Sequence, residues 1–227
     1  MRRRATLAGL LAAAALAAAG CASEDDAGSA GTTATPTADS AHGEHVATDH
    51  DGHVIGTVTY EGGTISPVRQ APPLALDDVA GRPVDLKDLR GGPVLVTFVY
   101  ATCPDVCPLI MSTIAEARRQ AGDAGEATKV IAVSVDPEGD TPQVVEAFLE
   151  RQGVGGFVDY TVGSRAELEA VWADWGVATD VPKDSPELIE HTSLIYGVNA
   201  SGELVTAYPV GFEAETVARD LERLAQT

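Results

Sequence analysis

An apolar run that leads directly into two cysteines is the feature that most constrains the fold of this chain. Residues 93–100 are nearly continuous in apolar and β-branched side chains, as in a strand buried on both faces. Cys103 and Cys107 follow, and apolar residues at helical spacing come after them. Two thiols at the start of a helix favour the thiolate form, because a helix N-terminus carries partial positive charge. Thiolates bind soft metal ions and exchange with disulfides, so both chemistries are open at this point.

Strand and helix patterns alternate along the chain after about residue 57. Ser164 and Glu167 have the spacing of a capping box, which marks the start of one helix. This alternation, closed by a hairpin and a last helix, predicts an α/β sandwich of thioredoxin-like type, with a central mixed β-sheet flanked by helices. Strands are predicted at 57–60, 74–76, 84–86, 93–100, 129–135, 157–161, 192–198 and 203–208, and helices at 109–120, 142–150, 165–175 and 214–225.

The first 20 residues have the pattern of an export signal. Three arginines precede a Leu- and Ala-rich run that is too short to span a membrane, and small residues then lead to Cys21. A cysteine at that place resembles the acylated cysteine of bacterial lipoproteins, although Ala18 stands where those signals usually have Leu. We therefore predict a lipoprotein signal peptide at 1–20, lipidation of Cys21, and a protein held on the outer face of the cytoplasmic membrane. Plain secretion, with Cys21 incidental, is the alternative.

Residues 21–56 are predicted to be a flexible tether, since they contain very few large apolar side chains. Four histidines lie between His42 and His53, interleaved with carboxylates that together with imidazole can capture metal ions loosely. A hydrophilic spacer of biased composition is the alternative. The remaining residues, 57–227, are predicted to form the thioredoxin-like domain, which is long enough to bury a core without disulfides.

The charge of the chain limits its partners. The formal net charge is −19, and such a surface repels phosphate backbones, so the charge argues against nucleic acid as a partner. Aromatic residues are only 5% of the chain, so no platform for base stacking stands out. The charge suits cations or a basic patch of another protein, or it simply keeps the protein soluble.

The spacing of the two cysteines brings their side chains to one face of the chain. Residues four apart on a helix lie about 5–6 Å apart at Cβ, so Cys103 and Cys107 can bind one ion or, if the loop adjusts, close a disulfide. The only histidine beyond the tether is His191, at the start of the strand where thioredoxin folds approach their redox turn. Two thiolates and one imidazole suit copper, whereas a structural zinc site would want four ligands. The predicted metal site is therefore Cys103, Cys107 and His191.

Three segments together resemble the Sco/SenC family, the copper-binding proteins of cytochrome oxidase assembly. They are residues 99–108 around the cysteines, residues 133–142 (Val-Ser-Val-Asp-Pro-Glu-Gly-Asp-Thr-Pro) and His191-Thr-Ser. The resemblance runs from about Pro72 to the C-terminus. It implies that the two cysteines and His191 bind copper. It also implies delivery of copper to the dinuclear centre of cytochrome c oxidase subunit II, reduction of the cysteines of that centre, or both.

Two other functions are compatible with the same fold. In a thiol-disulfide oxidoreductase, Cys103 would attack and Cys107 would resolve the mixed disulfide. In a peroxide-reducing enzyme, a catalytic Thr or Ser and an Arg would surround the thiol, and Arg118 is the nearest arginine in sequence. Asp105 and Asp136 are candidates for carboxylates that support the site, although an exposed loop acid and a turn residue explain them at least as well.

Overall fold

The fold is built around β6 (Val94–Val99), in which all six residues are buried. It pairs in parallel with β7 (Lys129–Ser134), which pairs in parallel with β8 (Val158–Val162). Val, Ile and Leu dominate the first two of these strands because helices cover both faces of the sheet, so neither face can be polar. The carboxyl ends of these parallel strands carry the loops in which the candidate site lies. These coordinates come from a computed structural model that describes residues 44–48, 54–182 and 188–227.

Antiparallel strands extend this parallel centre on both sides, so the sheet is mixed. The strand order is β3-β12-β11-β6-β7-β8-β4-β5. β11 pairs antiparallel with β6, placing Ile195 opposite Thr97 and Val198 opposite Val94. The flanking strands are β3 (Gly63–Gln70), β4 (Ala75–Asp78), β5 (Pro83–Asp85), β11 (Leu194–Val198) and β12 (Glu203–Pro209).

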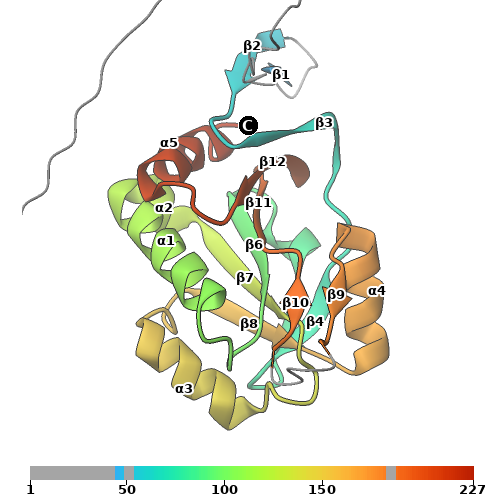
Figure 1. Cartoon of the computed structure of the whole chain (residues 1–227). Coiled ribbons are helices and arrows are strands. Elements are labelled where there is room, and N and C mark those ends of the chain that lie inside the picture. The colour runs from blue at the N-terminus through green and yellow to red at the C-terminus, as the bar shows by residue number, and fades with distance from the viewer. Residues whose placement is uncertain (1–43, 49–53, 183–187) are drawn as a thin grey trace, which may run out of the picture. The chain divides into compact units, whose positions relative to one another are not determined.

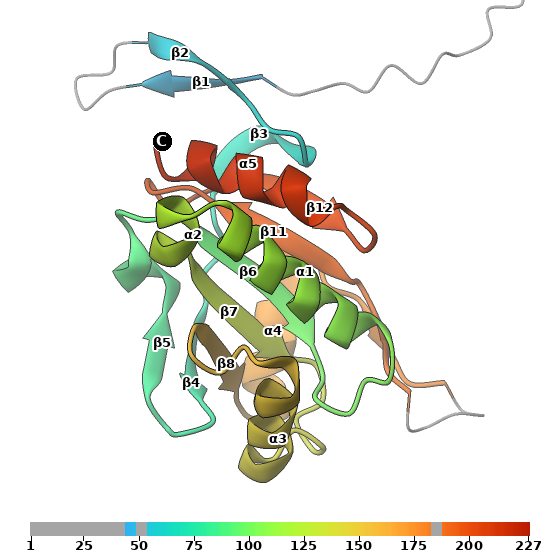
Figure 2. The same ribbon diagram turned by 90° about the vertical axis from the view of Figure 1, so that its left-hand side faces the viewer.

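Helices lie on both faces of the sheet (Figures 1 and 2). On one face α1 packs against α5, α2 and α3, and α4 lies on the other face. The helices are α1 (Val106–Gln120), α2 (Asp123–Ala127), α3 (Pro142–Gln152), α4 (Arg165–Trp175) and α5 (Ala214–Leu224), with a 3-10 turn η1 at Leu86–Leu89. Among the described residues no helix combines the length and apolar character that a membrane span needs.

The predicted elements are confirmed, with boundaries shifted by a few residues. The capping box at Ser164 and Glu167 is present, since each side chain accepts a hydrogen bond from the other residue's backbone N–H. The structure adds β3, η1, α2 and the short strands β9 (Thr179–Asp180) and β10 (Glu190–His191), which were not predicted. β3 lacks an alternating pattern because it is an edge strand that is largely exposed and contains Pro67.

Part of the predicted tether forms a hairpin. β1 (Glu44–Thr48) pairs antiparallel with β2 (Val54–Thr59), and both strands are rich in the β-branched residues that favour extended backbone. Cys21, the predicted signal peptide, His42, His50 and His53 lie outside the described residues. The predicted division at residues 20 and 56 therefore stays a prediction.

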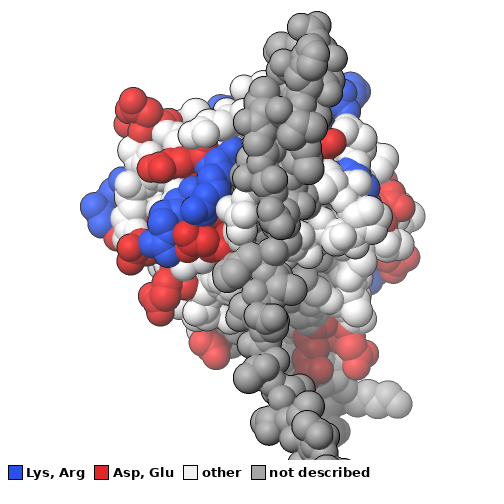
Figure 3. All heavy atoms as spheres, turned by 90° about the horizontal axis from the view of Figure 1, so that it is seen from above, with Lys and Arg blue, Asp and Glu red and all other residues white. Residues whose placement is uncertain are grey.

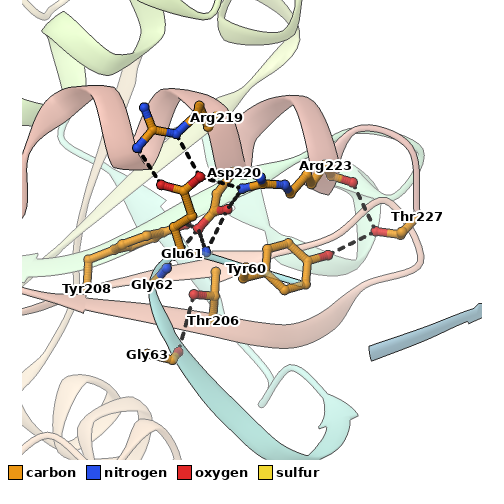
Figure 4. A network of polar contacts seen from close by, with 10 residues as sticks. All are labelled: Tyr60, Glu61, Gly62, Gly63, Thr206, Tyr208, Arg219, Asp220, Arg223 and Thr227. Atoms are coloured by element: carbon orange, nitrogen blue, oxygen red, sulfur yellow. Dashed lines mark hydrogen bonds and ion pairs between the residues drawn. The ribbon is translucent and has the colours of Figure 1, made fainter. Parts of the chain in front are cut away.

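A buried carboxylate joins α5 to the turn before β3 (Figure 4). Asp220 is fully buried, and it accepts hydrogen bonds from the N–H groups of Glu61 and Gly62 and from the hydroxyl of Tyr208. Arg223 pairs with the same carboxylate at 2.6 Å. A side chain at Gly62 would collide with Tyr208, which explains the glycine. We call the set Glu61, Gly62, Tyr208, Arg219, Asp220 and Arg223 the α5 cluster.

Candidate metal centre

The two cysteines lie where β6 ends and α1 begins, Cys103 in the segment 100–105 that we call the cysteine loop and Cys107 at the start of α1. Cys103 is half-buried in this loop, and its N–H donates to the carbonyl of Tyr100 at 3.2 Å. Cys107 is fully buried in the first turn of α1. Its backbone N–H donates to Cys103 Sγ at 3.3 Å. The structure therefore brings the two cysteines into contact, as their spacing predicted.

The two thiols have very different acidities. The pKa of Cys103 falls to about 5, chiefly because the S–H of Cys107 donates to its sulfur. Burial opposes this shift, while the N–H groups of Asp105 and Cys107 and the hydroxyl of Tyr100 support it. The pKa of Cys107 is raised, first because its proton is held in that hydrogen bond and second because the group is buried. At neutral pH the pair is thus one thiolate and one thiol, which share a proton between them.

Tyr100 connects the cysteine loop to the segment that carries His191. Its ring lies edge-on to the imidazole of His191, with 6.0 Å between ring centroids. Its hydroxyl donates to Cys103 and accepts the N–H of Ile189 at 3.4 Å. The pKa of Tyr100 is raised, mainly by burial. A single buried side chain therefore contacts both parts of the predicted site.

His191 is held by a two-stranded sheet formed by β9 and β10. It lies opposite Thr179 in that sheet, and the N–H of Thr192 donates to the carbonyl of Ala178 at 3.0 Å. His191 Nδ1 lies 3.0 Å from the carbonyl oxygen of Thr192. Because a carbonyl only accepts, Nδ1 carries the proton and Nε2 presents a lone pair. Burial lowers the pKa of His191, which keeps the imidazole neutral and suited to metal binding.

The three predicted ligands are not all within one coordination sphere. Among the residues that the structure describes, no three His, Cys, Asp or Glu side chains are close enough to hold one metal ion. Cys103 and Cys107 are in contact, and His191 is near enough to Cys103 for the thiolate charge to act on its pKa. The donor set of two sulfurs and one neutral imidazole nevertheless fits a soft ion such as Cu(I).

A buried acid lies beneath the cysteine loop. Asp140 accepts the N–H of Ala101 at 2.8 Å, the hydroxyl of Ser134 at 2.6 Å and the hydroxyl of Tyr160 at 2.7 Å. The first of these bonds fixes the loop two residues before Cys103. Burial raises the pKa of Asp140, although the three donors work against that shift. None of the ion pairs found among the described residues involves this carboxylate.

The two acids considered from sequence have other roles. Asp105 precedes α1 and is exposed, and its side chain does not cap the helix. The carboxylate of Asp136 accepts the N–H of Gly139 at 2.9 Å, which closes the turn after β7. A side chain at Gly139 would overlap this carboxylate and displace it from its hydrogen bond in the turn. Asp136 is thus a turn residue, and Asp140 is the acid that supports the cysteine loop.

A comparison with known protein families assigns the chain. The profile of the SCO1/SenC family matches residues 63–226, which is most of the chain and all of the main sheet. The chain belongs to the SCO1/SenC family. Among curated SCO1/SenC relatives, the SCO1 protein homolog of Bacillus subtilis is 23% identical over 141 residues, which covers 61% of this chain and 73% of that protein.

Solved structures of Sco proteins share the fold. Bradyrhizobium japonicum ScoI, solved with copper bound, is 32% identical with a TM-score of 0.61, covering 69% of this chain and 99% of that chain. Apo Sco1 from Thermus thermophilus is 29% identical with a TM-score of 0.61, covering 73% of this chain and 97% of that chain. The matches span 66% of the length of a Stutzerimonas stutzeri relative and 48% of the mouse Sco1 homolog.

Two residues of this SCO1/SenC site were missed in the sequence. Asp140 stands in the 133–142 motif, but the sequence assigns it no role, because its partners Ser134 and Tyr160 lie on β7 and β8 and meet it only in the folded sheet. Tyr100 was included in the cysteine motif without a role. An acid that directly precedes a Thr-Pro helix start, in the loop after a buried strand, is the signal that predicts a residue such as Asp140.

Proposed function

We propose that this chain is an extracytoplasmic copper chaperone that binds Cu(I) through Cys103, Cys107 and His191. The observation that carries the proposal is the pairing of a Cys103 thiolate with a neutral Cys107 thiol at the edge of a buried helix turn. Soft sulfur donors select Cu(I), and a neutral imidazole supplies a third donor. Membership of the SCO1/SenC family and the copper-bound ScoI relative support the same cargo.

In this proposal copper moves by ligand exchange to a protein with its own thiols and imidazoles. The resemblance to the family names the dinuclear copper centre of cytochrome c oxidase as the recipient. A Cu–S bond to Cys103 or Cys107 breaks as a sulfur of the partner binds the ion, so the metal keeps its oxidation state. The half-buried sulfur of Cys103 is the natural point of exchange, because Cys107 is enclosed.

Anaerobic titration of the full chain with Cu(I), in competition with a chelator of known affinity, tests the proposal. We expect stoichiometric binding by the native chain and loss of tight binding in Cys103→Ser and in Cys107→Ser. His191→Ala should weaken binding by about 10-fold to 100-fold, in the range for loss of metal-supporting groups. Glu222→Ala, at an exposed position of α5 remote from the site, is the control and should leave the affinity unchanged. Native binding no tighter than that of the cysteine variants would refute the proposal.

A second function is favoured by the low pKa of Cys103, about 5, beside a second thiol. In a thiol-disulfide oxidoreductase, the Cys103 thiolate attacks a disulfide of the partner and one partner thiolate leaves. Cys107 then gives up its proton and attacks Cys103 Sγ, releasing the second partner thiol. Two electrons pass to the partner, and Cys103 and Cys107 end as a disulfide. His191→Ala separates the two functions, since it should leave the exchange rate within about twofold while weakening copper binding.

We also propose that Cys21 is lipidated and holds the domain at the outer face of the cytoplasmic membrane. The support is the sequence pattern before it. Labelling of cells with a fatty-acid analogue should mark the native chain and not Cys21→Ser. Labelling of both would show that the lipid is elsewhere.

A further inference from the structure

A cleft of about 720 Å³ opens directly beside the cysteine loop. One wall is formed by Thr102 and Pro104, the two exposed residues that flank Cys103. Figure 1 shows the facing elements, β9, β10 and α4, near the end of β6 from which the chain enters α1. The rest of the lining comes from the turn after β7, from α4, and from the residues around β9 and before β10, and it includes Asp136, Glu138, Arg165, Asp180, Val181 and Leu188.

The lining of this cleft is acidic. Three carboxylates line it, and Glu138 and Asp180 are both exposed. Among the described residues of the lining, Arg165 carries the only basic group, and its guanidinium already pairs with Glu138 at 3.1 Å and with Glu169 at 3.8 Å. The lining therefore has a surplus of negative charge, which attracts a positively charged ligand.

Exposed apolar side chains accompany the acids. Val181 is 52% exposed and Leu188 is 37% exposed, and both line the cleft. Three other large apolar side chains of the described residues, Val68, Leu109 and Val210, are exposed to a similar degree, and none of them lines the cleft. Exposed apolar groups rimmed by polar ones are typical of protein interaction sites. A free inorganic cation would gain nothing from them, whereas a peptide segment would.

We propose that this cleft receives a basic loop of the protein that accepts copper, with Lys or Arg of the loop facing Glu138 and Asp180 and apolar side chains contacting Val181 and Leu188. A loop seated there lies next to Thr102 and Pro104 and so brings its own sulfur and imidazole ligands to Cys103. The inference rests on the proposed chaperone function, because it names the kind of partner which that function needs.

Binding can be measured without copper, so that docking is separated from metal chemistry. The probes are two synthetic dithiol peptides of equal length and cysteine spacing, one with Lys and Arg around the cysteines and one with Asp and Glu. Fluorescence anisotropy follows their binding to the full chain carrying Cys21→Ser, Cys103→Ser and Cys107→Ser, which contains no thiol and so cannot be linked to the peptides by copper or by a disulfide. We expect the basic peptide to bind at least about tenfold more tightly than the acidic one, and added salt to weaken this binding.

Charge reversal in the cleft locates the binding. In the same thiol-free chain, Glu138→Lys together with Asp180→Lys should weaken binding of the basic peptide by about tenfold and strengthen binding of the acidic one. Asp174→Lys on the exposed part of α4, outside the lining, is the matched control and should change binding by less than about twofold. Thermal melts should show that all variants are folded.

The outcomes distinguish the two proposals. Equal binding of both peptides, or an equal loss in Asp174→Lys and the double variant, overturns the docking proposal even if copper binds at Cys103. Charge-dependent binding that the double variant abolishes supports docking. If the peptide binding depends on charge but the native chain takes up no Cu(I), the chaperone proposal fails, and the cleft is then a docking site for a thiol-exchange partner.

Discussion

Two buried carboxylates fix turns in this domain, and their surroundings differ in one respect. Asp220 in the α5 cluster accepts two backbone N–H groups and a tyrosine hydroxyl, and Arg223 neutralises it. Asp140 beneath the cysteine loop accepts one backbone N–H and two hydroxyls, and it forms no ion pair with any of the described residues. Figure 3, which looks onto the α5 side, shows basic and acidic side chains side by side, as the pairs of Arg219 and Arg223 with Glu61 require.

The difference extends to the cysteines. Cys103 is held as a thiolate by neutral donors, namely the S–H of Cys107, backbone N–H groups and the hydroxyl of Tyr100. The α5 cluster therefore neutralises its charges internally, which suits a purely structural role. In the part of the chain that the structure describes, no cationic side chain pairs with Asp140 or stabilises the Cys103 thiolate, so the cysteine loop holds negative charge without a cation of its own. A bound Cu(I) ion would supply that missing positive charge, so the electrostatics of the apo site favour the proposed cargo.

The largest expected effect is on the acidity of Cys103. In the reduced, metal-free chain carrying Cys21→Ser, alkylation by iodoacetamide should have its midpoint near pH 5, against the ordinary thiol value of 9.0. Because the folded pKa is lowered, the contribution of this thiolate to stability is complete above pH 9 and is lost as the pH falls toward 5. Cys107→Ala should raise the midpoint, since its S–H makes the largest contribution. Mass spectrometry of quenched samples gives the rates.

A midpoint near pH 9 in the folded chain would contradict this prediction and remove the contrast between the two regions. Tyr100→Phe is a finer test, because it deletes one hydroxyl donor and keeps the ring. It should raise the pKa of Cys103 less than Cys107→Ala does. Cys103→Ser controls for labelling at the buried Cys107.

The next largest effect is on stability at the α5 cluster. Asp220→Ala should lower the free energy of unfolding by about 3–5 kcal/mol, because it leaves Arg223, two N–H groups and a tyrosine hydroxyl without their partner. Urea denaturation measures this loss. Glu222→Ala, on an exposed position of the same helix, should stay within about 0.5 kcal/mol of the native chain. A change in Cu(I) affinity of folded Asp220→Ala would contradict the purely structural role.

The sequence could predict elements whose signals are local. The apolar run of β6, the capping box at Ser164 and the unique His191 could each be identified without tertiary contacts. Features that depend on contacts between residues distant along the chain could not be predicted from the sequence. Asp140 meets Ala101 and Tyr160 only after three strands are aligned, and β3 is held by pairing with β12 in place of any pattern of its own. The missing part of the site is thus the part made by long-range contacts.

Asp140 should show a smaller loss of stability that depends on pH. Asp140→Ala leaves three donors unpaired and should cost about 2–3 kcal/mol, whereas Asp140→Asn keeps an acceptor and should cost less. The folded pKa of Asp140 is raised, so its protonated form stabilises the fold below the ordinary value of 3.8, and this contribution is lost as the pH rises through the folded pKa. Urea titrations across this range give the free energies.

The free energy of unfolding of Asp140→Asn is expected to lie below that of the native chain, and this difference should shrink as the pH rises. The nearby groups that can blur the titration are Asp136, Tyr160 and Cys107, each of which interacts with Asp140. Repeating the series with Cys107→Ser removes the thiol contribution. A deficit that grows with pH would mean that Asp140 is stabilised as an anion, like a carboxylate paired with arginine, and the comparison would fail.

The smallest effect is expected for the exposed arginine of the α5 cluster. Arg219 pairs with Glu61 and Glu215 on the surface, where solvent screens the charges, so Arg219→Gln should lower Tm by less than about 3 °C and by still less at high salt. Arg223→Gln removes the partner of a buried carboxylate and should lower Tm more. Differential scanning calorimetry compares the two. Equal decreases in Tm for the two variants would mean that the surface ion pairs stabilise the α5 cluster as much as the buried one does. Burial of Asp220 would then not explain why this region contains an arginine beside its buried carboxylate.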